Sequence, residues 1–146
     1  MASIHDVAKY FLLQADEEAG DTISNLKLQK LAYYAQGFHL ALTGKALFPE
    51  QVQAWTHGPV SPDLYRAYKE HGSAALPAPE QFDDTALSPA ETEILDEVYS
   101  VYGQFSAWKL RNLTHEEAPW VDAYREGANT EISQESMRLF FASQLN

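Results

Sequence analysis

The chain has 146 residues, of which 45% are hydrophobic and 21% are charged, and its formal net charge is −11 with a pI near 4.7. This length and composition are typical of a globular protein, so we expect a single domain over residues 1–146. The negative charge argues against binding to nucleic acid or to anionic lipid, because both need a positive field. It permits a basic protein partner.

The sequence contains no cysteine, which excludes disulfides, thiolate catalysis and cysteine-based zinc or iron–sulfur sites. The first twenty residues have neither a basic n-region nor a long apolar run, so they predict no signal peptide and no membrane span. We therefore expect a cytoplasmic protein. No oligomeric state follows from the sequence.

Six serines stand where helical patterns begin, and each is predicted to be an N-cap. The first helix is expected to fade into the acidic loop at 16–21, and the longest should end at a left-handed glycine. The serines, with the expected ends of their helices, are Ser3, Ser24 (to Gly44), Ser61 (to Gly72), Ser88 (to about Gly103), Ser106 (through Leu113) and Ser133.

Between Lys45 and Pro59 the helical period is lost, which predicts loop and short extended structure. Thr114 and Glu117 have capping-box spacing and predict one more helix. Residues 73–87 are expected to form a surface connection. Since no run of alternating residues is convincing, the expected fold is all-α, with about six to eight helices and an irregular loop containing tryptophan, glycine and proline near residues 45–60.

No residue pattern predicts a catalytic or metal site. The histidines lack the i, i+4 pairing of a helical metal site, and the GxSxG elbow and the glycine-rich phosphate loop are both absent. The histidines are His5, His39, His57, His71 and His115. We therefore expect no metal, no cofactor and no catalytic residue.

Lys27 and Lys30 lie one helical turn apart. They could form a small basic patch, but an ordinary solvated helix face is the preferred interpretation. Trp55 and Trp120 stand beside proline-containing turns, where they could brace the core or anchor a protein interface.

Three blocks of sequence occur in a specific order. They are ISNLKLQKLAYYAQGFHLALTGKALF, AWTHGPVSPDLYRAYKEHG and YGQFSAWKLRNLTHEEAPW. Together, the patterns LKLQKLxYYxQG, AWxxGPVxPxxY and LTHxExPW closely resemble the Panacea-domain family, the SocA-like antitoxins that are often described as phage-associated proteins. The resemblance extends over nearly the whole chain.

The resemblance implies a compact all-helical domain that neutralises a cognate toxin by binding it directly, without a cofactor. Such toxins are commonly encoded by the adjacent gene. The residues that match the family motifs are expected to be scaffold or toxin-binding residues, with scaffold as the preferred role and residues 73–87 as the place where partner choice lies. They are Leu28, Lys30, Tyr33, Tyr34, Gln36, Trp55, Gly58, Pro59, Tyr65, Thr114, His115, Pro119 and Trp120.

Two other functions remain as alternatives. One is a proteolytic adaptor that delivers a bound partner to a cytoplasmic protease, which shares the binding step with an antitoxin. The other is a small hydrolase that uses His57 or His115 with a nearby carboxylate.

Trp55→Ala and Trp120→Ala are expected to lower the melting temperature, because truncating an enclosed tryptophan costs about 3–5 kcal/mol of a domain's roughly 5–15 kcal/mol. Substitutions within 73–87 should instead alter partner binding and leave the fold intact. Thermal melts beside pull-downs with the partner separate the two effects. If Trp55→Ala melts like the parent and loses its partner, the scaffold interpretation is wrong.

Overall fold

The structure is a computed structural model that describes residues 1–15 and 21–145. Its helices are α1 (Ile4–Gln14), α2 (Asn25–Thr43), α3 (Pro62–Tyr68, continued by a 3-10 turn at Lys69–His71), α4 (Pro89–Tyr102), α5 (Ala107–Thr114), α6 (Ala118–Glu126) and α7 (Gln134–Gln144). Its strands are β1 (Val52–Trp55), β2 (Gly58–Val60) and β3 (Thr130–Ile132). Most of the loop expected at 16–21 lies outside the described residues.

Local capping chemistry sets most of the helix starts. All six predicted serine N-caps are confirmed, since each hydroxyl accepts a hydrogen bond from the backbone N–H three residues further on. Gly44 ends α2 in the left-handed conformation with a φ of 76°, and its N–H donates to the Leu40 carbonyl.

The capping box predicted at Thr114 and Glu117 is wrong. Thr114 is the last residue of α5, and its hydroxyl donates to the Arg111 carbonyl at 2.7 Å. Glu117 is the N-cap of α6 but makes no side-chain capping bond, because two tyrosines occupy its carboxylate.

The fold prediction holds in part: the described residues form seven helices, within the expected six to eight, but the fold is not strictly all-α because the strands form a small antiparallel sheet in the order β2-β1-β3. Each strand has only three or four residues, which is too short for alternation to be distinguished from a loop. The β1–β3 register pairs Val52 with Ile132, residues far apart in sequence, so no local pattern indicates it. Pro59 lies in the edge strand β2, where a missing N–H is tolerated.

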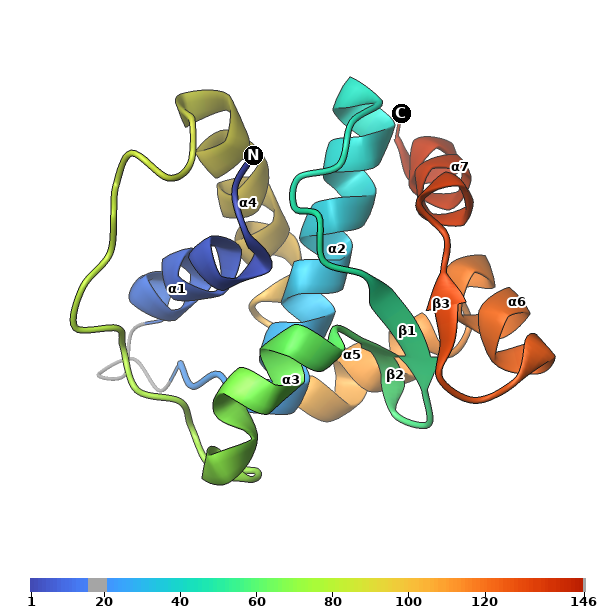
Figure 1. The fold of residues 1–146 in the computed structure, drawn as a ribbon, viewed down its shortest axis with the longest axis horizontal. Helices are drawn as coiled ribbons and strands as arrows, with labels where there is room; N and C mark the ends of the chain where they lie inside the picture. The colour runs from blue at the N-terminus through green and yellow to red at the C-terminus, as the bar shows by residue number, and fades with distance from the viewer. Residues whose placement is uncertain (16–20, 146) are drawn as a thin grey trace.

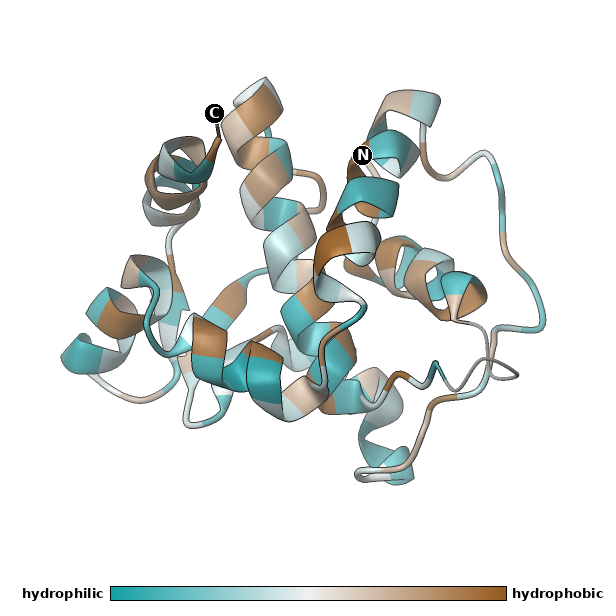
Figure 2. Cartoon of the chain, turned by 180° about the vertical axis from the view of Figure 1, so that it is seen from behind, coloured by the Kyte–Doolittle hydropathy of each residue, from teal (hydrophilic) through white to brown (hydrophobic). Residues whose placement is uncertain are grey.

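Helix α2 runs through the middle of the molecule and is contacted by α1, α3, α4, α5, α7 and β2 (Figure 1). Its residues are buried on every side over nearly the whole stretch from Asn25 to Gly37. Even so, hydrophilic residues interrupt the hydrophobic ones along it (Figure 2). Those enclosed polar side chains need partners inside the protein.

Close packing against α7 fixes one face of α2. The ring of Phe141 lies against Gly37 and meets the Tyr33 ring edge-on, with a centroid distance of 5.4 Å. Within the described residues, no helix is long and apolar enough to cross a lipid bilayer.

Gly37→Ala is expected to destabilise the protein by about 1–3 kcal/mol, because the added Cβ would overlap the Phe141 ring. Helix propensity alone predicts the opposite sign, since alanine is favoured over glycine by about 1 kcal/mol in a helix interior. Urea denaturation distinguishes the two. The control is the same substitution in a Phe141→Leu background, where the smaller side chain should reduce the penalty. A raised urea midpoint for Gly37→Ala would contradict this packing.

Candidate functional site

The three sequence motifs converge around α2. The first motif lies on α2 itself, the second forms the β1–β2 hairpin and the start of α3, and the third joins α5 to α6 (Figure 1). Every motif residue on α2 is buried: Leu28, Lys30, Tyr33, Tyr34 and Gln36.

Lys30 lies at the junction of the motifs and is wholly enclosed, with no exposed surface. Its ammonium donates to the Pro59 carbonyl at 2.9 Å, which ties α2 to the hairpin. Burial lowers the pKa of Lys30 to about 7, and the positive charge of Arg111 acts in the same direction. Lys27 is also buried, and it donates to the Gly103 carbonyl at 2.6 Å. Both predictions made for these lysines from the sequence are therefore wrong: they form neither a basic patch nor a solvated helix face.

Gly58 permits the close approach of Lys30 to the hairpin. It has a φ of 111°, where side chains are rarely found. A Cβ there would lie 2.6 Å from Cε of Lys30 and 2.8 Å from the hydroxyl oxygen of Thr114. Glycine, lysine and threonine from three separate motifs therefore meet at one point.

Glu117 is the shared acceptor for two tyrosines of α2. Its carboxylate oxygens accept hydrogen bonds from Tyr33 at 3.1 Å and Tyr34 at 2.9 Å. Burial raises the pKa of Glu117 to about 7, although the two tyrosine hydrogen bonds act the other way. The Tyr34 ring also stacks on Tyr102, with the centroids 3.9 Å apart. This cluster holds the start of α6 against α2.

The third motif packs as a stack of rings against β1. His115 stacks on Trp120 with a centroid distance of 4.0 Å, and Tyr124 lies beside Trp120 at 4.6 Å. The Trp120 indole N–H donates to the Trp55 carbonyl at 2.8 Å. Burial and the charge of Arg111 lower the pKa of His115, so its ring is neutral at pH 7. Pro119 is buried in the first turn of α6.

Gln36 fixes the loop that leads into β1. Its amide nitrogen donates to the Phe48 carbonyl at 2.9 Å, and its amide oxygen accepts from the Leu47 N–H at 2.7 Å. Leu28 belongs to the hydrophobic core.

An open hollow of about 570 Å³, which we call the aromatic groove, lies beside this network. Among the residues that bound it are Trp55, His57, Tyr65 and Trp108, from the hairpin, α3 and α5. Trp108 is 55% exposed and Tyr65 is 40% exposed, so both present ring surface to solvent. The Arg111 guanidinium lies 4.4 Å from the Trp108 ring centre and donates to His57 Nδ1 at 3.1 Å. These contacts hold the Trp108 ring in place, and the Tyr65 ring packs against Trp55 with a centroid distance of 5.2 Å.

Residues 73–87 lie largely on the surface and are anchored at a few apolar points. Leu76 and Leu87 are buried, and the Leu76 N–H donates to the Ile23 carbonyl at 2.8 Å. Ser73 reaches the rim of the aromatic groove. Over residues 1–15 and 21–145, no three histidine or carboxylate side chains gather as metal ligands would.

The roles of Glu117, Arg111 and Trp108 were not predicted from the sequence. A signal for Glu117 was present, because two adjacent tyrosines on a buried helix need a hydrogen-bond partner. The position of Arg111 between His57 and Trp108 depends on packing between the hairpin and α5, which sequence spacing does not encode.

Glu117→Gln is expected to flatten the dependence of stability on pH between 4.5 and about 7, the ordinary and the raised pKa values of this carboxyl. Over that interval the folded protein keeps a proton that the unfolded chain has released. Stability therefore falls as pH rises, by up to about 3 kcal/mol. Urea denaturation across this range, with the exposed Glu126→Gln as control, measures the slope. An unchanged slope in Glu117→Gln would contradict the assignment.

Comparison with known proteins places these motifs in one family. The model of the family described as "Antitoxin SocA-like, Panacea domain" matches residues 28–121, which include the first motif from Leu28 onward and the whole of the other two. Antitoxin SocA of Caulobacter vibrioides (strain NA1000 / CB15N) is 46% identical over 50 residues, 34% of this chain, and the match spans only 27% of that relative's length. No solved structure matches. Since the family model covers more than half of the sequence, this chain belongs to the SocA-like antitoxins with a Panacea domain.

Proposed function

We propose that this chain is a cytoplasmic antitoxin that neutralises a cognate toxin by direct protein–protein binding, with no cofactor and no catalytic step of its own. Membership of the SocA-like family supports the antitoxin activity. The observation that carries the binding mechanism is the aromatic groove, where exposed rings are held in place beside the family motifs.

The chemistry of the aromatic groove suits a protein partner. Tryptophan, tyrosine and arginine are the residues most often found at the energetic centre of protein interfaces. Trp108 is held by Arg111, and the Trp55 indole N–H donates to Gln53 at 2.9 Å. Because these side chains are ordered before the partner arrives, little conformational entropy is lost on binding.

The motif residues themselves act mainly as scaffold in this proposal. Most of them are enclosed, and the side chains of Lys30, Gln36 and Trp120 make hydrogen bonds to the backbone of the hairpin and the loop before it. A partner cannot touch Lys30 or Tyr33 without unfolding the domain. Partner choice then lies in exposed positions at the groove rim, including the segment 73–87 that begins there.

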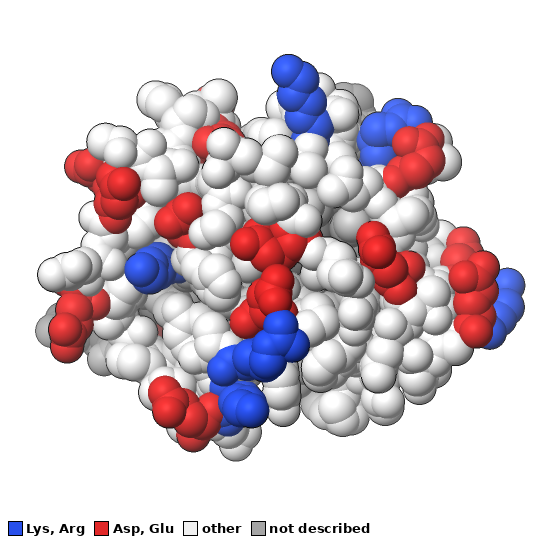
Figure 3. Space-filling model, viewed as in Figure 1, with Lys and Arg blue, Asp and Glu red and all other residues white. Residues whose placement is uncertain are grey.

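Net charge supports a basic toxin. The formal charge of −11 gives a negative field that speeds encounter with a positively charged protein. Carboxylates are spread over the face seen in Figure 3, and several of its few lysine and arginine side chains lie beside them. Once bound, the antitoxin would block the active or target-binding surface of the toxin.

Trp108→Ala is expected to abolish protection against the toxin encoded by the adjacent gene while leaving the fold intact, because the ring is 55% exposed. Growth after co-expression measures protection, and co-purification measures binding. The matched control is Leu13→Ala, an exposed apolar residue of α1 outside the groove, which should protect fully.

Two results would contradict the proposal. One is an adjacent gene whose product is harmless when expressed alone. The other is a toxin whose half-life falls when this protein is present, since that result indicates delivery to a protease rather than occlusion.

A further inference from the structure

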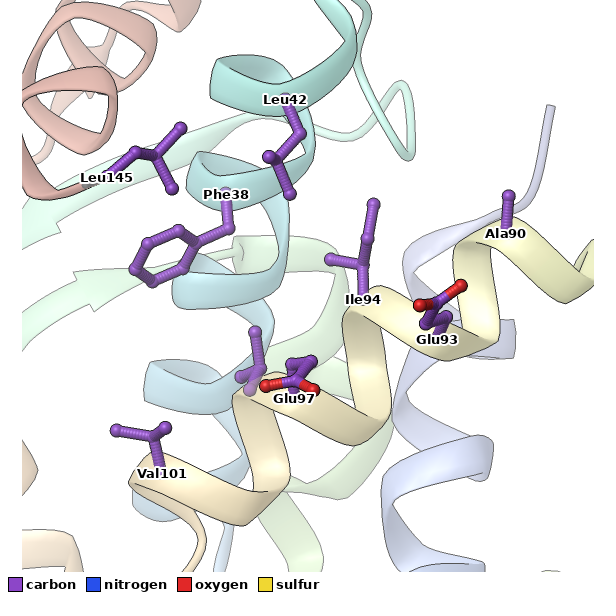
Figure 4. Close-up of a pocket in the computed structure, with 9 residues that line it drawn as sticks. Phe38, Leu42, Ala90, Glu93, Ile94, Glu97, Val101 and Leu145 are labelled. Carbon is purple, nitrogen blue, oxygen red and sulfur yellow. The ribbon is translucent and has the colours of Figure 1, made fainter.

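A second hollow, which we call the apolar groove, lies between α2, α4 and the C-terminal end of α7. It measures about 470 Å³, and Figure 4 shows side chains from the three segments turned toward it. Its lining residues are Phe38, Leu42, Ala90, Glu93, Ile94, Glu97, Val98, Val101 and Leu145.

The α4 wall is a continuous helical stripe. Its lining positions 90, 93, 94, 97, 98 and 101 are spaced three and one residues apart, which is the pattern of one helix face. From Ala90 to Val101 this face is roughly 16 Å long, about three helical turns. Phe38 and Leu42 supply the opposite wall from successive turns of α2.

The rim of the apolar groove exposes large hydrophobic side chains. Leu42 is 55% exposed, Val101 47% and Leu145 39%. Scattered exposed apolar residues are ordinary, but a group of them around one hollow marks an interaction site. Because these side chains stay largely in contact with water in the folded chain, they gain little from the hydrophobic effect unless a partner covers them.

Two carboxylates line the same groove. Glu93 and Glu97 are one turn apart on α4, and both are exposed. Neither belongs to the ion pairs found among residues 1–15 and 21–145. The groove therefore combines an apolar floor with two unneutralised negative charges at its edge.

The apolar groove is separate from the aromatic groove, with which it shares no lining residue. Asn25 and Gln29 of α2 line the aromatic groove, whereas Phe38 and Leu42 line the apolar one. Along α2 the two sets begin thirteen residues apart, or roughly 20 Å. A partner on one surface leaves the other accessible.

We infer that the apolar groove is a docking site for an amphipathic helix of a partner protein, about three turns long, with an apolar stripe flanked by lysine or arginine. The apolar stripe fills the space between Leu42, Ile94 and Val101. The flanking cations pair with Glu93 and Glu97. This is helix-in-groove recognition, in which apolar anchors give affinity and charge gives orientation.

Charge argues against two other occupants of the apolar groove, a second copy of this chain and an anionic membrane. A second copy of this chain would bring its own Glu93 and Glu97 and a further −11 of net charge to the contact. An anionic membrane would be repelled in the same way. A basic helix meets attraction from both the groove and the whole protein.

A labelled model helix tests the inference without any toxin, so its outcome is independent of the proposed function. The probe is a synthetic peptide of leucine and lysine, with its leucines on one helical face, and fluorescence anisotropy measures its dissociation constant. Leu42→Arg and Val101→Arg are each expected to weaken binding about tenfold or more, because they place a cation in the apolar contact. The matched control is Leu139→Arg on α7, which changes the charge equally at a residue 57% exposed and outside the groove.

The carboxylates need their own control. The double variant Glu93→Gln, Glu97→Gln should bind the lysine peptide more weakly than Glu126→Gln, Glu131→Gln, which removes the same charge from exposed positions elsewhere. The inference is overturned if Leu42→Arg binds as tightly as Leu139→Arg, or if a glutamate version of the peptide binds as well as the lysine version. It is also overturned if the protein forms a dimer, or binds anionic vesicles, in a manner that Leu42→Arg abolishes and Leu139→Arg does not.

Discussion

The burial of α2 is the constraint on which the rest of the structure depends. A helix enclosed on all sides cannot leave its polar side chains unpaired, because each would cost about 1–3 kcal/mol. Here they reach the backbone of the surrounding segments: Lys27 bonds Gly103, Gln29 bonds the Ser61 N–H, Lys30 bonds Pro59, and Gln36 bonds Phe48 and Leu47. The helix thereby fixes the ends of α3 and α4, the hairpin and the loop before it.

These hydrogen bonds from buried side chains to backbone groups explain why the family motifs need particular residue types. A side chain that bonds a backbone group restricts residue identity only where it approaches closely, as Lys30 does at Gly58, so the exposed residues of the segment that it holds are free to differ. Trp120 follows the same rule, since its indole N–H donates to the backbone carbonyl of Trp55. One buried scaffold can thus carry different exposed surfaces.

Sequence predicts the parts of this structure that are set locally. The six serine caps and the glycine that ends α2 each depend on residues within one turn, and all were predicted correctly. The sheet was not, because β1 pairs with a strand near the C-terminus. Lys30 was misassigned for a similar reason: a lysine normally indicates solvent, and only the packing of α5 and the hairpin around α2 encloses it. The motif residues were found through the resemblance, whereas the two grooves are visible only in three dimensions.

Two buried ionisable groups of this network depend on pH in opposite directions. The pKa of Glu117 is raised from 4.5 to about 7, so its contribution to stability falls as pH rises through that interval. The pKa of Lys30 is lowered from 10.5 to about 7, so its contribution falls as pH decreases over that range. Their combined contribution to stability is therefore smallest near pH 7. What the two residues supply is placement: Lys30 sets the hairpin against α2, and Glu117 sets α6 against the same helix.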